Sequence, residues 1–296
     1  SYSVTGVQTC ALPIFFMVDI KYSQNLYTNK THLQKLVKLS RINSNDIVLD
    51  IGAGTGVITE ELSKYAKQVI AYELDPKYFE VLKKRFNNTP NVILKNEDFL
   101  DIQLPQKEFK IFSNIPFSLT SDIINKITDL DSKFVEAFIF LQKESAKRYL
   151  GKPKNTQISS ILSFRYDINI IEEFNPGDFK PVPNVDIILL KLKARSFNKQ
   201  DYLLYRDFVT YVFNQMNRSV LDTFKELFTY KQLKYVKQYL EENNYSKPTD
   251  IPSGYYLDVF QKFKLNGDKY ISRVEGYYLR NIKQHAHREK VHRTRV

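Results

Sequence analysis

The chain has 296 residues and a mass of 34.9 kDa, which is enough for two domains of ordinary size. Hydrophobic residues make up 43% and charged residues 26% of the sequence, which is ordinary globular usage and excludes a disordered, collagen-like or disulfide-scaffold protein. Lys and Arg number 44 against 33 Asp and Glu, so the net charge is +11. This excess predicts a polyanionic partner, either nucleic acid or an anionic membrane.

Cysteine and histidine are scarce. The single cysteine, Cys10, excludes an intramolecular disulfide, and three of the four histidines, His285, His287 and His292, lie near the C-terminus. We therefore expect no metal, no His-based zinc site and no Ser-His catalytic site. The longest apolar run near the N-terminus, residues 11–18, is too short to span a bilayer. We expect a cytoplasmic protein without membrane attachment.

The first residues differ in pattern from the remainder of the chain. Residues 1–16 share no periodicity with the later segments, whereas the segment that begins at Met17 resembles the natural N-terminus of a protein. We interpret residues 1–16 as an artefact or a disordered leader.

From residue 47 the chain alternates short β-branched runs with helical patterns. We predict strands at 47–52, 69–74, 92–95, 109–113 and 137–141, separated by helices at 57–66, 76–86 and 121–130. This alternation is typical of a parallel, doubly wound α/β sheet, and β-rich stretches at 158–171 and 186–192 are expected to complete it. We therefore expect a Rossmann-like domain over residues 17–194.

The pattern becomes helical after residue 194. Amphipathic repeats at 202–216, 219–227, 230–242 and 255–263 predict a smaller all-helical domain over residues 195–265. Residues 266–296 show no clean periodicity, and we interpret them as a basic tail. Residues 262–296 hold ten Lys and Arg against three Asp and Glu. This charge predicts non-specific contact of the tail with phosphates, and the alternative is a disordered tail with no effect on nucleic-acid binding.

A glycine-rich turn follows the first predicted strand. The sequence DIGAGTG at residues 50–56 places Gly52 and Gly54 where the backbone can approach a ligand beside a helix N-terminus. A dinucleotide-binding turn has glycine where this chain has Val57, which disfavours a pyrophosphate ligand. Taken alone, the motif also fits a purely structural turn.

Acidic residues end the next two strands. Glu73 lies 21 residues after Gly52, where a carboxylate can accept hydrogen bonds from both ribose hydroxyls of an adenosine. Such an acid fits NAD and S-adenosylmethionine equally well. Asp98 ends the third strand beside Phe99, where a carboxylate can accept from an adenine amine. Either acid alone also fits a solvated strand end.

The sequence NIPF at residues 114–117 ends the fourth strand and is the most specific signal. An exocyclic adenine amine is a poor nucleophile because its lone pair is delocalised into the ring. The side-chain oxygen of Asn114 and a fixed backbone carbonyl, both accepting from that amine, would free the lone pair. Pro116 fixes the turn, and Phe117 offers a flat face to the base.

Together these motifs resemble the rRNA adenine N6-methyltransferases, and most closely the Erm family, which dimethylates one adenine of 23S rRNA. The sequence SQNLY at residues 23–27 is similar to the family's opening cofactor motif, with Leu26 where Phe is usual. The resemblance implies S-adenosylmethionine as cofactor, with S-adenosylhomocysteine as product. It implies cofactor contacts from Asn25, the backbone of Tyr27, Gly52, Gly54, Glu73, Asp98 and Asn114.

The resemblance also implies how the target adenine is bound. Asn114, Phe117 and Phe179 would form the catalytic pocket, with Phe117 standing where the family more often has Tyr. The sequence FKPVPNV at residues 179–185 resembles the late motif whose Phe stacks on the base from the other side. Residues 142–154 carry five Lys and Arg against one acid, and in this family that stretch faces RNA.

We therefore expect a monomeric enzyme that methylates a single adenine of 23S rRNA once or twice and so confers resistance to macrolide, lincosamide and streptogramin B antibiotics. Three alternatives remain open. They are a KsgA-type dimethyltransferase of small-subunit rRNA, a non-catalytic RNA-binding relative of the fold, and an adenine methyltransferase acting on free DNA. The pattern at residues 224–232 favours the Erm helical domain over the KsgA type.

Overall fold

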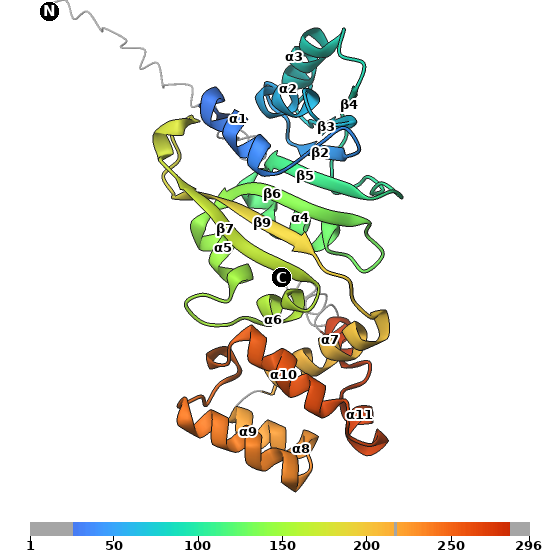
Figure 1. The fold of residues 1–296 in the computed structure, drawn as a ribbon, viewed down its shortest axis with the longest axis vertical. Coiled ribbons are helices and arrows are strands. Elements are labelled where there is room, and N and C mark those ends of the chain that lie inside the picture. The colour runs from blue at the N-terminus through green and yellow to red at the C-terminus, as the bar shows by residue number, and fades with distance from the viewer. Residues whose placement is uncertain (1–25, 216–217, 285–296) are drawn as a thin grey trace, which may run out of the picture.

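The computed structural model describes residues 26–215 and 218–284. Within them, a seven-stranded sheet with covering helices lies above a bundle of helices in Figure 1. The strand order is β4-β3-β2-β5-β6-β9-β7. The strands are β2 (Ile47–Ile51), β3 (Gln68–Tyr72), β4 (Val92–Lys95), β5 (Phe109–Asn114), β6 (Phe134–Gln142), β7 (Tyr166–Phe174) and β9 (Ile187–Ala194).

The sheet is parallel from β4 through β6, and β9 and β7 complete it in antiparallel pairing. Because parallel strands point the same way, the segments after β2, β3, β4 and β5 meet at one edge of the sheet. The helices of this part are α1 (Lys30–Leu39), α2 (Val57–Ser63), α3 (Pro76–Phe86), α4 (Thr120–Ile127), α5 (Lys143–Leu150) and α6 (Gln157–Ser163). The predicted Rossmann-like α/β fold is confirmed.

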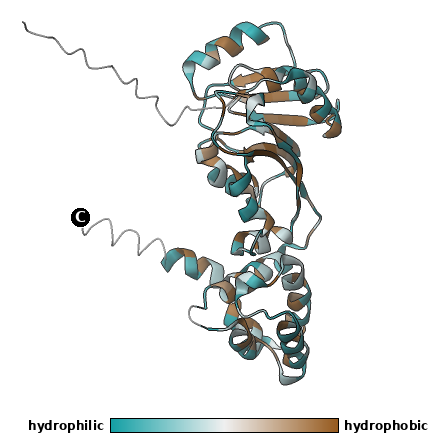
Figure 2. Cartoon of the chain, turned by 90° about the vertical axis from the view of Figure 1, so that its left-hand side faces the viewer, coloured by the Kyte–Doolittle hydropathy of each residue, from teal (hydrophilic) through white to brown (hydrophobic). Residues whose placement is uncertain are grey.

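Alternate residues of the central strands enter two cores, one on each face of the sheet. In β5, Ile111 packs into the core that includes Ile124 of α4 and Ala146 of α5, whereas Phe112 packs into the core that includes Leu36 of α1 and Leu62 of α2. Figure 2 shows the consequence, since hydrophobic colour runs along the strands and hydrophilic colour marks the outer helices. Burial on both faces explains why these strands read as continuous apolar runs.

The prediction of β structure over residues 158–171 is half wrong. Its first part is helix α6, and β7 begins at Tyr166. Thr156 starts the helix with a capping box, in which its side chain accepts from the Ser159 amide and the Ser159 side chain accepts from the Thr156 amide. This reciprocal cap outweighs the β-branched composition of the segment.

The helical part comprises α7 (Lys199–Phe213), α8 (Val220–Leu227), α9 (Tyr230–Glu242), α10 (Ser253–Phe263) and α11 (Asp268–Val274). Its core is aromatic, with Phe208, Phe224 and Phe260 fully buried, and it also takes in Ile161 of α6. Buried Asn155 strengthens this connection by donating to the Ile251 carbonyl at 2.7 Å and the Ser160 hydroxyl at 2.8 Å. The sheet and the bundle are therefore joined through α6. In the part of the chain that the structure describes, no helix has the length and apolarity to cross a bilayer.

The basic tail predicted from residue 266 differs from the structure at its start. Helix α11 and further helical residues at 277–284 continue the bundle. The side chain of Val274 is 0% exposed, and the buried Asp207 carboxylate accepts from the amides of Gly276 at 2.6 Å and Tyr278 at 2.9 Å. The sequence pattern did not reveal this helix because it is short and charged, with Tyr270, Ile271 and Val274 as its residues packed on the core.

Replacing Val274 with Ala tests whether this segment belongs to the core. The variant removes two buried methyl groups and should lower the free energy of unfolding by about 2 kcal/mol. Ile282 lies in the same segment but is 47% exposed, so Ile282→Ala is the matched control and should change stability by less than about 0.5 kcal/mol. Urea unfolding of both variants gives the comparison, and equal effects would contradict the assignment.

Candidate active site

A pocket lies where the segments after the parallel strands meet. It encloses about 540 Å³ of empty space that is partly open to solvent. The residues after β2, β3, β4 and β5 all contribute to its wall, and α3 and α4 add apolar side chains. The lining residues are Ile51, Gly52, Tyr72, Glu73, Leu74, Asp75, Tyr78, Glu97, Asp98, Phe99, Leu100, Pro116, Leu119 and Ile123.

The glycine turn forms one side of the pocket and needs glycine for its backbone. Gly52 and Gly54 have φ values of 72° and 56°, in the left-handed region that favours glycine. The amides of Gly52 and Ala53 donate to the Tyr72 carbonyl at 2.8 and 3.0 Å, which ties the turn to the end of β3. The turn is therefore fixed before any ligand arrives.

Glu73 is held at the centre of this arrangement and is 2% exposed. Its carboxylate accepts from the Gly54 amide at 2.7 Å and from the Asp75 amide at 2.9 Å. Burial raises the pKa of Glu73, and the two backbone hydrogen bonds oppose that rise. The Asn96 side chain donates to the Glu73 carbonyl at 2.7 Å and so ties the end of β3 to the segment after β4.

Asp50 is a second buried acid behind the turn. The Thr59 hydroxyl donates to Asp50 Oδ2 at 2.6 Å, whereas Oδ1 has no hydrogen-bond partner within the described residues. Burial raises the pKa of Asp50 to about 7, and the negative charge of Glu73 adds to the rise. The sequence analysis gave Asp50 no role, although an acid inside an apolar strand was the available signal.

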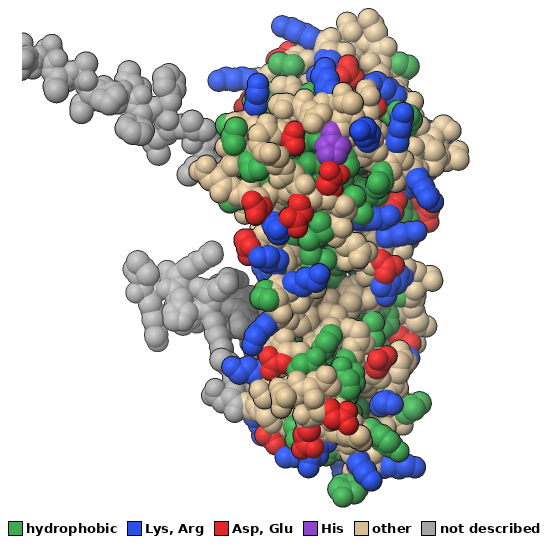
Figure 3. All heavy atoms as spheres, turned by 60° about the vertical axis from the view of Figure 1, so that its left-hand side comes forward, with side chains coloured by type: hydrophobic (Ala, Val, Ile, Leu, Met, Phe, Trp, Pro, Cys, Tyr) green, Lys and Arg blue, Asp and Glu red, His purple; other side chains and the backbone are tan. Residues whose placement is uncertain are grey.

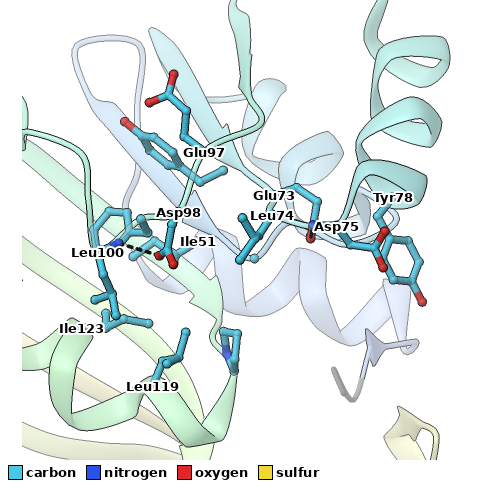
Figure 4. A pocket seen from close by; sticks show the side chains of 14 residues that line it. Ile51, Glu73, Leu74, Asp75, Tyr78, Glu97, Asp98, Leu100, Leu119 and Ile123 are labelled. Carbon is cyan, nitrogen blue, oxygen red and sulfur yellow. Dashed lines mark hydrogen bonds between the residues drawn. The ribbon is translucent and has the colours of Figure 1, made fainter. Parts of the chain in front are cut away.

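Asp98 lies in the segment after β4 and lines the pocket near Ile51. Its carboxylate accepts a hydrogen bond from the Leu100 amide at 2.9 Å, drawn dashed in Figure 4, and Leu119, just before α4, and Ile123 of α4 lie near it in the same view. The pocket thus combines carboxylates on two strand ends with apolar walls. The sequence analysis missed Tyr78 of α3, Leu119 just before α4 and Ile123 of α4, because nothing in a helical pattern distinguishes a pocket wall from a core.

Asn114 and Phe117 lie next to this pocket. Asn114 is the last residue of β5, is 8% exposed, and stands opposite Phe140 of β6 in the sheet register. Pro116, two residues later, lines the pocket, and Phe117 is partly exposed in the 3-10 turn Phe117–Leu119. The predicted tetrapeptide therefore reaches the same sheet edge as Gly52, Glu73 and Asp98.

Tyr27 and Phe179 pair directly in a two-stranded sheet of β1 (Leu26–Tyr27) and β8 (Phe179–Lys180). Their ring centroids are 5.1 Å apart, and both rings pack on Phe140, opposite Asn114. Phe117 is partly buried against the hydrophobic core that includes these rings. Asn114 thus stands between a polar pocket and an aromatic cluster.

The position of Phe179 differs from the expectation that it presents a face to a base. Its side chain is 0% exposed, because Tyr27, Phe140 and Phe174 surround the ring. In this arrangement no face of Phe179 is open to a ligand. Asn25, the other predicted residue of the opening motif, lies outside the described residues.

The basic stretch at residues 142–154 is less charged than its sequence indicates. Lys143 pairs with Glu173, Lys147 with Glu144, and Lys154 with Asp250 of the helical part. Arg148 and Lys152 form no ion pair within the part of the chain that the structure describes. The same part contains no group of three or more His, Cys, Asp and Glu that could hold a metal ion.

A family model described as ribosomal RNA adenine dimethylase matches residues 16–264. The chain belongs to this ribosomal RNA adenine dimethylase family. The resemblance to the Erm rRNA adenine N6-methyltransferases, drawn from the motifs, is confirmed. Membership implies methyl transfer to rRNA adenine with S-adenosylmethionine as the donor.

Relatives of two kinds are similar to this family member. An rRNA adenine N-6-methyltransferase of Limosilactobacillus reuteri is 30% identical over 250 residues, 83% of this chain and 97% of the relative. Ribosomal RNA small subunit methyltransferase A of Thermotoga neapolitana is 32% identical over 190 residues, 63% of this chain and 72% of the relative. Among solved structures, the 23S rRNA methyltransferase ErmE has a TM-score of 0.73 at 21% identity and covers 81% of this chain and 100% of its own, which shows a shared fold.

The burial of Asp50 predicts a pH-dependent stability of this dimethylase family member. The folded-state pKa lies near 7, above the unfolded value of about 3.9, so the folded protein binds the proton more tightly and loses stability as pH rises from about 4 to 7. Asp50→Asn removes this loss. Its free energy of unfolding relative to the wild type should therefore rise between pH 4 and pH 8, by at most about 4 kcal/mol.

Denaturant unfolding of both proteins across this range measures the difference. Asp131→Asn is the control, because the Asp131 carboxylate is 83% exposed, and it should follow the wild-type slope. A wild-type slope that survives in Asp50→Asn would assign the pH dependence to another group.

Proposed function

We propose that this chain transfers methyl groups from S-adenosylmethionine to the N6 amine of a single adenine in 23S rRNA, and that by its Erm resemblance it confers resistance to macrolide, lincosamide and streptogramin B antibiotics. The observation that carries the proposal is the position of Asn114. It stands at the sheet edge where the parallel strands end, between the pocket that holds the Glu73 and Asp98 carboxylates and a cluster of aromatic rings. We further propose that the enzyme acts as a monomer in the cytoplasm.

The residues present fit S-adenosylmethionine. Glu73 uses two of its lone-pair positions on backbone amides, and the others remain for ribose hydroxyls. Asp98 would accept from the adenine amine beside the apolar wall formed by Leu119 and Ile123. Gly52 and Gly54 let the backbone approach the cofactor closely, and Asn25 and the Tyr27 backbone would contact its methionine end. When bound, the cofactor supplies an electrophilic methyl group on a sulfonium.

Asn114 would activate the target amine. Its side-chain oxygen and a carbonyl of the turn fixed by Pro116 would accept from the two N–H groups and localise the lone pair on nitrogen. That lone pair would then be free to take the methyl group that the bound cofactor supplies, and the sulfonium would leave as a neutral thioether. The methylated amine is acidic, so its extra proton leaves to solvent. No enzyme nucleophile is needed, because the attacking atom belongs to RNA.

Two aromatic residues would hold the flipped adenine. Phe117 is partly exposed and offers stacking worth about 1–3 kcal/mol. Phe179 can stack only if RNA binding separates it from Tyr27, since the ring is buried between strands β1 and β8. Its role in the pocket therefore includes a local opening of this two-stranded sheet.

The choice of 23S rRNA rests on the helical part. The pattern at residues 224–232 resembles the Erm helical domain, and the similarity to the Limosilactobacillus reuteri enzyme extends over 97% of that enzyme. The second candidate is a KsgA-type dimethyltransferase of small-subunit rRNA. It is favoured by the 32% identity to the Thermotoga neapolitana enzyme.

Methylation of purified rRNA separates the two candidates. We expect labelled methyl from S-adenosylmethionine to enter unmodified 23S rRNA, with primer extension stopping at one adenine in the peptidyl-transferase loop. Label confined to two adjacent adenines of 16S rRNA would assign the KsgA-type function. Label in neither rRNA, with cofactor binding intact, would contradict both.

Replacing Asn114 tests the mechanism. Asn114→Ala should abolish methyl transfer and leave S-adenosylmethionine affinity within about tenfold, because the lost acceptor serves chiefly the reacting amine. Asn169→Ala, an asparagine of β7 away from the pocket, is the control and should retain wild-type turnover. Single-turnover transfer and cofactor titration measure the two effects. Normal turnover in Asn114→Ala would refute this role.

A further inference from the structure

The described part of the β1–β8 sheet is two residues long in each strand. It pairs Leu26 with Lys180 and Tyr27 with Phe179, and it is separate from the seven-stranded sheet. An isolated pair of strands is marginal in water even when it is longer. Side-chain contacts from outside the pair must therefore fix Tyr27, whose backbone the proposed function places at the methionine end of the cofactor.

A series of hydrogen bonds connects Tyr27 to β7 through His32. The Tyr27 hydroxyl lies 3.0 Å from His32 Nδ1, and His32 Nε2 lies 3.1 Å from Glu172 Oε2 and 3.0 Å from Oε1. A carboxylate only accepts, so Nε2 carries the proton that it donates to Glu172, and in the neutral ring Nδ1 then accepts from the tyrosine. Burial, with the nearby charges of Asp178 and Glu172, raises the pKa of Tyr27, so its hydroxyl keeps the proton that it donates.

Helix α1 fixes His32 in the middle of this series. The Asn29 side chain caps α1 by accepting from the His32 amide at 3.1 Å, and Leu33 of the same helix is buried in the core. His32, the purple side chain in Figure 3, is 25% exposed and has acidic side chains nearby on that face. Its ring also packs on Phe174, with ring centroids 5.6 Å apart. The imidazole therefore has a defined position from which to hold Tyr27.

A bulge in β7 turns Glu172 toward α1. The register changes between Ile170 and Glu172, where β7 holds one residue more than its partner β9. In consequence Glu172 stands opposite Leu189, which packs in the core on the α1 face of the sheet. An unbroken register would place it opposite Ile188, which packs in the core on the other face. Because opposed residues of a sheet share a face, the bulge places the Glu172 carboxylate within reach of His32.

We propose that His32 is a positioning residue for the cofactor: together with Glu172 it fixes Tyr27, and so holds the backbone of β1 in place for the methionine end of S-adenosylmethionine. The identity of this ligand rests on the proposed function. The Tyr27 side chain is 3% exposed, so Tyr27 acts through its backbone and its ring serves as the anchor. The three residues come from β1, α1 and β7, and no local sequence motif contains them.

Titration with two nucleosides separates positioning from folding. S-adenosylhomocysteine and 5′-methylthioadenosine share the adenosine and a neutral thioether sulfur, and the first alone has the amino-acid end. Tyr27→Phe and Glu172→Ala should each weaken binding of S-adenosylhomocysteine about fivefold, the loss of one neutral hydrogen bond, and leave that of 5′-methylthioadenosine within about twofold. Glu172→Gln keeps an acceptor for Nε2 and should restore most of the affinity.

The double variant tests whether the two ends act through His32. Among the described residues, the hydrogen-bond link between Tyr27 and Glu172 passes through this imidazole. The variant that combines Tyr27→Phe with Glu172→Ala should bind S-adenosylhomocysteine within about twofold of either single variant, because each change already breaks the same link. Additive losses, about 25-fold in total, would contradict a shared role.

Tyr205→Phe and Glu173→Ala are the matched controls. Tyr205 is buried in the helical core and donates to the Ser160 carbonyl at 3.0 Å, and Glu173 is the exposed next residue of β7. Both variants should leave both affinities unchanged, although Tyr205→Phe should lower the melting temperature about as much as Tyr27→Phe does. Thermal melting of each variant confirms that it folds, and the Glu172 variants alone decide the outcome if Tyr27→Phe does not.

The positioning role and the proposed function fail separately. If the wild type binds S-adenosylhomocysteine and the folded Tyr27 and Glu172 variants bind it equally well, or lose 5′-methylthioadenosine to the same extent, the positioning role is overturned and the function stands. If the variants show the expected loss but the wild type methylates no 23S rRNA, the function fails and the positioning role stands. A wild type that binds neither nucleoside would overturn both.

Discussion

The fixing of the buried Glu73 carboxylate by two backbone amides is the interaction on which the rest of the site depends. A charged group at 2% exposure is tolerated only when hydrogen bonds replace its lost water. Gly54 and Asp75 supply them, and the Gly54 amide points at Glu73 because the glycine turn has left-handed backbone angles and is tied to the Tyr72 carbonyl. One carboxylate therefore sets the shape of the turn, the end of β3 and one wall of the pocket.

The position of Asn114 follows from the same parallel sheet. Since β5 lies next to β2, the end of β5 brings Asn114 and Pro116 beside the glycine turn, and the pairing of β5 with β6 places Phe140 and the aromatic cluster on the other side. Polar groups that suit a nucleoside cofactor and rings that suit a flipped base thus meet at one residue. Helix α6 joins this sheet to the helical core, because Ile161 of α6 packs into that core.

The sequence predicted those parts of the structure that depend on local pattern. The parallel strands, the glycine turn and helix α3 could be read from periodicity and turn chemistry, and the order of Gly52, Glu73, Asp98 and Asn114 on successive strand ends identified the family. What it could not predict depends on contacts between distant segments. Phe179 is buried because Tyr27, more than 150 residues earlier, pairs with it, and α11 forms because Val274 finds an aromatic core built by α7 and α8. Three of the basic residues at 142–154 are neutralised by nearby acids, and two of those acids lie far along the chain.

Titration of S-adenosylmethionine into the free enzyme and two glutamate variants tests the central claim most directly. Glu97 also lines the pocket but is exposed, so Glu97→Gln is the matched control for Glu73→Gln. The account predicts that Glu73→Gln weakens cofactor binding by roughly 10- to 100-fold, the loss of a charged hydrogen bond of about 1.5–3 kcal/mol, and that Glu97→Gln changes it by less than about threefold. Unchanged affinity in Glu73→Gln, or an equal loss in both variants, would contradict it.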